Sequence, residues 1–110
     1  METLPFEQTL KNRGKYYNGF RVNARYFGSY CYDALAIALN SFYHSSSFMS
    51  AVSKAINYRG DADTTGAITG QLAGAFYGYT SIDERAIKVL YTWDRGEIAQ
   101  KGEALAKAAI

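Results

Sequence analysis

The sequence has one cysteine, one proline and no long apolar run. The single Cys31 excludes a disulfide within the chain and is compatible with a reducing compartment. The longest apolar-leaning stretches, 30–43 and 66–79, are shorter than the ~20 residues that span a bilayer. The start of the chain lacks the apolar segment of a signal peptide. We therefore expect a soluble, cytoplasmic protein with no membrane partner.

Positive and negative side chains nearly balance, since the net charge is only +2. A charge this small does not by itself indicate a nucleic-acid partner. The 110 residues, 48% of them hydrophobic, suit one small domain or a piece of a larger one. No alternating run of convincing length predicts a strand in the body of the chain. The predicted fold class is all-α.

Residues 1–27 are interpreted as an irregular lead-in rich in basic and aromatic side chains. Segment 11–25 carries five Lys and Arg residues without an acid, and Asn18-Gly19 predicts a tight hairpin turn between two short extended pieces. Basic residues mixed with aromatic rings can bind single-stranded nucleic acid. A solvated loop crossing a larger body is the favoured interpretation, and residues 28–110 are assigned to one helical domain.

Apolar spacing and capping signals predict five helices. Ser46 or Ser47 is a candidate N-cap, and Ser81 with Glu84 matches a capping box. Wide apolar faces, including Phe48, Val52 and Ile56, are expected to pack inward. The last helix has few apolar positions and is expected to be peripheral. The predicted ranges are 30–43, 47–57, 64–77, 82–92 and 96–109.

Four glycines recur every fourth residue from Gly66 to Gly78. Each interior glycine costs a helix roughly 0.5–1 kcal/mol relative to alanine. This cost predicts a compensating close approach of another backbone along the glycine stripe, as the dense packing of interiors allows. Helix 64–77 is therefore expected to be central.

The segment Gly60-Asp61-Ala62-Asp63-Thr64 places two acids at the start of that helix. In a regular helix the two carboxylates would point about 200° apart, but they can converge in the turn before it. Carboxylate and hydroxyl oxygens suit a hard cation such as Mg²⁺. The alternative is helix capping and a favourable helix dipole, which need no metal.

Residues 57–67 and 70–78, with the aromatic pair Phe76-Tyr77, closely resemble the C-terminal signature of the ADP-ribosylglycohydrolases. Residues 26–35 resemble the segment that precedes this signature, and the likeness spans 26–94. The resemblance implies a compact orthogonal helical bundle around two Mg²⁺ or Mn²⁺ ions. It implies that Asp61 and Asp63 are carboxylate ligands and that Thr64 contributes its hydroxyl. More weakly, it places Gly28 and Ser29 near the substrate cleft, and it assigns Trp93 to packing.

The resemblance also implies an activity, the metal-dependent hydrolysis of ADP-ribosyl glycosidic bonds. The expected partner is an ADP-ribosylated protein or ADP-ribose. The family's other metal ligands lie in a Thr/Ser-Asp-Asp run of its N-terminal part, and residues 1–27 contain no such run. We therefore expect half of the ligands here, to be completed by an N-terminal half or by self-association. The alternative is a non-catalytic helical scaffold that binds a partner.

Overall fold

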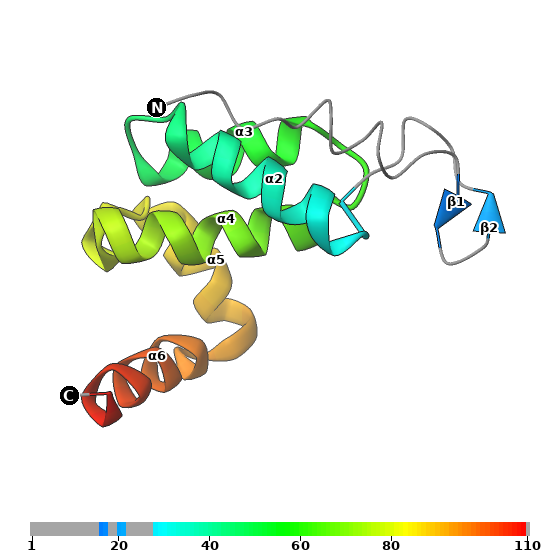
Figure 1. Cartoon of the computed structure of the whole chain (residues 1–110). Coiled ribbons are helices and arrows are strands. Elements are labelled where there is room, and N and C mark those ends of the chain that lie inside the picture. Colours follow the sequence, from blue (N-terminus) through cyan, green and yellow to red (C-terminus); the bar gives the residue numbers. More distant parts are fainter. Residues whose placement is uncertain (1–15, 18–19, 22–27, 110) are drawn as a thin grey trace.

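The computed structural model describes residues 16–17, 20–21 and 28–109 (Figure 1). Five α-helices and one 3₁₀ helix make up nearly all of the body, which confirms the all-α class and the helical bundle. None of the described helices combines the length and apolar character needed to cross a membrane. In chain order the elements are β1 (Tyr16–Tyr17), β2 (Phe20–Arg21), α2 (Cys31–Tyr43), α3 (Phe48–Asn57), α4 (Ala62–Tyr77), η1 (Tyr79–Ser81), α5 (Glu84–Asp94) and α6 (Glu97–Ala108).

The two short strands form the predicted hairpin. Strand β1 pairs antiparallel with β2, with Tyr16 opposite Arg21 and Tyr17 opposite Phe20. The predicted turn itself, at residues 18–19, lies outside the described residues. The rest of the lead-in lies outside the described residues, so the interpretation of 1–27 and its nucleic-acid alternative stay predictions.

Helix α4 is central, as predicted, because it packs against both α2 and α3 (Figure 1). The faces that meet are made mostly of small side chains, which let the helix axes approach closely. Thr65 and Thr69 are fully buried, and their hydroxyls donate to backbone carbonyls of α4 or of Asp61, which precedes it. The buried residues of the three helices are Asp33, Ala34, Ile37, Ala38 and Ser41 on α2, Ala51 and Ala55 on α3, and Thr65, Thr69 and Ala73 on α4.

The glycine stripe is not the contact surface that the sequence predicted. A Cβ on Gly66 would lie 3.3 Å from the Ile56 side chain, and one on Gly74 would lie 3.8 Å from Phe48. A Cβ on Gly70 or Gly78 would meet no described atom within 4 Å. No backbone approaches these four positions among the described residues, so that prediction was wrong. The close approach falls instead on the neighbouring row of Thr65, Thr69 and Ala73.

The buried face of each packed helix is also narrower than expected. On α3 the fully buried residues are Ala51 and Ala55, while Ile56 is 47% exposed. On α2, Leu35 is 48% exposed although it lies beside the predicted apolar stripe. The periodicity identified the correct helices, but apart from Ile37 the fully buried apolar residues are alanines.

Helices α5 and α6 leave their apolar side chains uncovered by the described part of the chain. Trp93 is 85% exposed, so its predicted packing role was wrong. Leu105 on α6 is 72% exposed, and Figure 1 shows α6 apart from the α2–α4 layer, which confirms that it is peripheral. The predicted ion pairs of α6 are present, at 3.0 Å for Glu97–Lys101 and 2.9 Å for Glu103–Lys107.

The cap of α5 differs from the predicted capping box. Ser81 ends η1, and its hydroxyl donates to the Gly78 carbonyl, so it does not cap α5. Asp83 is the N-cap, and its carboxylate accepts from the Arg85 amide at 2.8 Å. The hydrogen-bonded Arg85 guanidinium and amide lower the pKa of Asp83 to about 2.

The predicted cap of α3 is confirmed at Ser47. Its hydroxyl accepts from the Ser50 amide, and the Ser50 hydroxyl accepts from the Ser47 amide, both at 3.1 Å. We expect Ser47→Ala to lower the free energy of unfolding by about 1 kcal/mol, because an amide at the start of a core helix loses its acceptor. Urea unfolding followed by circular dichroism measures this change. Ser46→Ala is the control, since Ser46 contacts Ser50 through its backbone amide; equal losses in the two variants would contradict the assignment.

Candidate metal centre

The two acids of the signature lie on a tight turn between α3 and α4. Arg59 and Gly60 both adopt left-handed conformations, with φ of 64° and 63°. Two such residues in succession reverse the chain sharply after α3. Asp61 then takes the N-cap position of α4 with non-helical dihedral angles, and Asp63 lies in the first turn. The roughly 200° separation that a regular helix would impose on the two side chains therefore does not apply here.

The carboxyl groups of Asp61 and Asp63 lie close enough to interact. A hydrogen bond from Asp63 is the largest cause that lowers the pKa of Asp61, followed by the Thr64 side chain and then by Ser29. Two carboxylates that lie close together repel each other, and a divalent cation held between them would offset that repulsion.

Helix capping explains little of the contacts of Asp61. Its side chain makes no capping hydrogen bond of normal geometry to α4. The Thr64 amide donates to Asp63 Oδ1 at 3.1 Å and is the weakest of the groups that lower the pKa of Asp61. Asp61 therefore interacts more strongly with the side chains of Asp63, Thr64 and Ser29 than with the Thr64 amide.

Gly28 and Ser29, predicted to lie near the substrate cleft, are brought against Asp61. Gly28 is buried with φ of +104°, and a Cβ there would lie 2.9 Å from Thr65 Cγ2 and 3.2 Å from Asp61 Cβ. The Ser29 hydroxyl is hydrogen-bonded to the Asp61 carboxylate. The loop before α2 and the start of α4 thus form a single polar site.

Asp33 is a residue of this site that the sequence reasoning missed. It is fully buried on α2, and its Oδ2 accepts from the Gly28 amide at 2.8 Å. This hydrogen bond holds the Gly28 loop against the start of α4. The sequence did contain a signal, since Asp33 lies four positions before Ile37 and therefore on the same, buried face of the helix. A buried acid is rare unless it has a structural partner, so its position indicates one.

The donors present fit a hard divalent cation. Oxygens of Asp61, Asp63, Thr64 and Ser29 lie together, and Mg²⁺ is commonly bound by one or two carboxylates while it keeps several waters. No group of three or more His, Cys, Asp or Glu residues is gathered for a metal in the described ranges. The donor set is therefore suitable in chemistry and incomplete in number.

Comparison with known proteins identifies relatives of this chain. The sequence profile of the ADP-ribosylglycohydrolase family matches residues 6–110. The chain is 36% identical to the ADP-ribosylarginine hydrolase Tri1 of Serratia proteamaculans over 84% of its length, which is 25% of that relative. It is 35% identical to the ADP-ribosyl-[dinitrogen reductase] glycohydrolase of Rhodospirillum rubrum over 70% of its length, which is 26% of that relative. The chain thus spans about a quarter of the length of these curated relatives. No solved structure matches it significantly.

Proposed function

This chain belongs to the ADP-ribosylglycohydrolase family, and we propose that it supplies one edge of a metal-dependent site that hydrolyses ADP-ribosyl bonds on modified proteins. The observation that carries the proposal is the closeness of the Gly28–Ser29 loop to Asp61, whose carboxylate also interacts with Asp63. The named activities of the curated relatives support the same reaction class.

In this proposal each residue has a distinct task. Asp61 and Asp63 hold Mg²⁺ or Mn²⁺, two ions in the complete site, and Thr64 adds its hydroxyl. Ser29 orients the Asp61 carboxylate through their hydrogen bond. The two bound metal ions would polarise oxygens of the ribose and activate a water molecule. Gly28 leaves the space in which the ligands and the ribose approach closely.

Two carboxylates hold a divalent cation weakly, so we propose that a further acidic segment completes the site. An N-terminal half or a second copy of this chain would provide it. The substrate would be an ADP-ribosylated protein, or ADP-ribose itself as the smallest ligand. Because Cys31 cannot pair within the chain, a reducing cytoplasmic location is part of the proposal.

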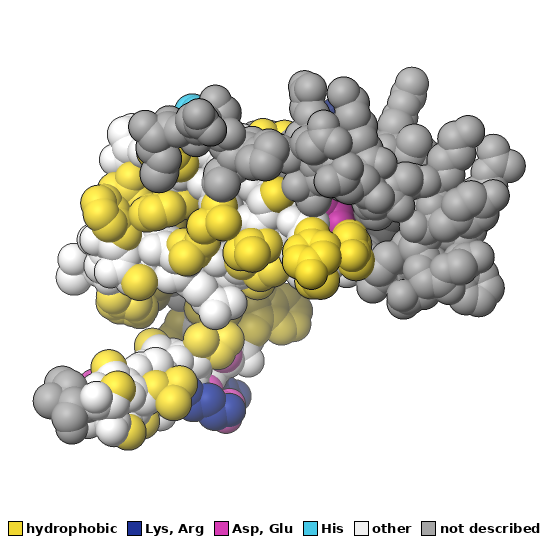
Figure 2. Space-filling view, in the orientation of Figure 1, with side chains coloured by type: hydrophobic (Ala, Val, Ile, Leu, Met, Phe, Trp, Pro, Cys, Tyr) yellow, Lys and Arg dark blue, Asp and Glu magenta, His cyan; other side chains and the backbone are white. Residues whose placement is uncertain are grey.

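A non-catalytic scaffold is the second candidate, and the uncovered apolar side chains favour it. Figure 2 shows hydrophobic side chains gathered over the face of α2 and α4. Tyr32 is 63% exposed and Phe76 is 71% exposed, both far above the exposure of a core ring. Exposed apolar patches commonly mark interaction sites. A scaffold would bind a partner there without hydrolysing any bond.

Release of ADP-ribose from Arg-linked and Ser-linked ADP-ribosyl peptides tests the enzymatic proposal. We expect release that requires Mg²⁺ or Mn²⁺, rises more steeply than linearly with chain concentration if the site is completed by self-association, and falls by more than about 100-fold in Asp63→Asn. Asp83→Asn is the control, because it removes a carboxylate but keeps a good N-cap on α5.

Metal-independent release, or equal release by Asp63→Asn and the parent chain, would contradict the proposed role of the acids. If no release occurs with the metals at any concentration, self-association does not complete the site, and the N-terminal half is required.

A further inference from the structure

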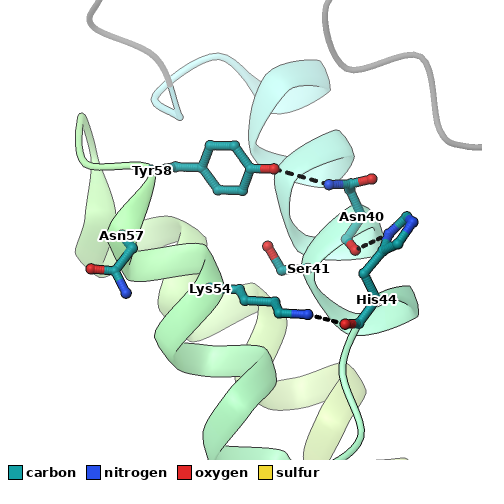
Figure 3. Close-up of a pocket in the computed structure, with 6 residues that line it drawn as sticks. All are labelled: Asn40, Ser41, His44, Lys54, Asn57 and Tyr58. Atoms are coloured by element: carbon teal, nitrogen blue, oxygen red, sulfur yellow. Dashed lines mark hydrogen bonds between the residues drawn. The ribbon is translucent and has the colours of Figure 1, made fainter.

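A second polar site lies in an open groove between α2 and α3 (Figure 3). Its volume is about 400 Å³, within the range of roughly 300–1,000 Å³ typical of small-molecule sites. Two polar bridges cross it. The Asn40 amide donates to the Tyr58 hydroxyl at 2.9 Å, and the Lys54 ammonium donates to the His44 carbonyl.

The Ser41 hydroxyl lies between these two bridges, on the floor of the groove (Figure 3). Ser41 is 1% exposed, and its Oγ has no hydrogen-bond partner. A buried hydroxyl without a partner is unfavourable, because it has lost its hydrogen bonds to water and gained none in return. A ligand that reaches this floor would provide the missing partner.

The ammonium group of Lys54 can bind an anion in the groove. Lys54 is the one formally charged residue that lines it, and no acid is among the described lining residues. The carbonyl of His44, at the negative C-terminal end of α2, uses one of the three ammonium donors of Lys54. The other two donors can bind an anion, and the Ser41 hydroxyl can donate to it from below.

We propose that this groove binds a small organic anion, through a carboxylate or phosphate group held between Lys54 and Ser41. The groove uses other residues than the acidic centre, since its lining includes none of Gly28, Ser29, Asp61 and Asp63. The proposal therefore stands apart from the hydrolytic function, and the loss of either leaves the other in place.

Titration of the full chain with succinate and, separately, with inorganic phosphate tests the proposal by ¹H–¹⁵N NMR. We expect saturable shifts of the amides of Ser41 and Lys54 with a dissociation constant near or below about 10 mM. Tighter binding of succinate would identify a carboxylate ligand, and tighter binding of phosphate a phosphate ligand. Lys54→Gln should weaken binding about tenfold, the loss expected for one charge-assisted hydrogen bond.

Ser41→Ala should weaken binding about fivefold while the chain melts at the same or a higher temperature, because the variant removes an unpartnered buried hydroxyl. Lys88→Gln is the matched control, since it removes the same charge from α5 and should leave binding unchanged. Shifts that sodium chloride reproduces, shifts confined to other helices, or equal affinities of Lys54→Gln and Lys88→Gln would overturn the proposal.

Discussion

Replacement of Asp61 by Asn is expected to weaken Mn²⁺ binding by at least about tenfold. The side chains of Asp63, Thr64 and Ser29 all interact with the Asp61 carboxylate and lower its pKa, so this carboxylate lies at the centre of the site. Asn keeps the shape and the N-cap preference of Asp but loses the charge that a hard cation requires. Isothermal titration calorimetry or the paramagnetic signal of free Mn²⁺ measures the affinity.

Two comparisons make this result specific to the site. Asp83→Asn should leave Mn²⁺ affinity unchanged, because Asp83 pairs with Arg85 on a different helix. Ser29→Ala should reduce the affinity less than Asp61→Asn does, since Ser29 orients the carboxylate without replacing it. If Asp61→Asn binds Mn²⁺ as tightly as the parent chain, the acids of the turn are not ligands.

The features that the sequence predicted well depend on local signals. Three such features are the Ser47 cap, the pairing of β1 with β2 and the extents of the helices. Each follows from residues within a few positions of one another. The turn at Arg59 and Gly60 that precedes the two acids is local in the same sense, while the role of Asp61 and Asp63 as ligands stays a prediction. Short-range signals therefore determine the helical framework.

The features that the sequence did not predict depend on contacts between distant segments. Whether Trp93 is covered is decided by what lies against α5, and the periodicity of that helix carries no such information. The role of Asp33 emerges only when the Gly28 loop folds back onto α2. In the same way, the glycine stripe predicted that α4 is closely packed. It did not predict which face of α4 meets the neighbouring helices.

One arrangement of three helices explains the positions of both proposed sites. Helix α4 packs against α2 and α3, so the loop before α2 meets the turn before α4 at Gly28 and Asp61. Residues Asn40 and His44 lie in the second half of α2 or just beyond it, and at about 1.5 Å per residue this places His44 roughly 20 Å along the helix from its start. The lone histidine therefore belongs to the groove and not to the acidic centre.

Substitution of Gly28 by Ala is expected to lower both stability and metal affinity. The added Cβ would lie 2.9 Å from Thr65 Cγ2 and 3.2 Å from Asp61 Cβ, at a φ of +104° that side chains rarely adopt. Left-handed strain of this kind costs about 1–3 kcal/mol. Relief of the clash must move the loop or Asp61, so Mn²⁺ affinity should fall several-fold in the fraction that remains folded. Urea unfolding and Mn²⁺ titration of the same sample separate the two effects.

Gly70→Ala is the matched comparison, because a Cβ there would meet no described atom within 4 Å. Gly70 lies inside α4, where alanine is favoured over glycine by roughly 0.5–1 kcal/mol, so this variant should be more stable than the parent and bind Mn²⁺ equally well. The same chemical change thus has opposite signs at two glycines of one chain. Equal effects at Gly28 and Gly70 would mean that the loop before α2 does not contact Asp61. The loop would then not be part of the polar site.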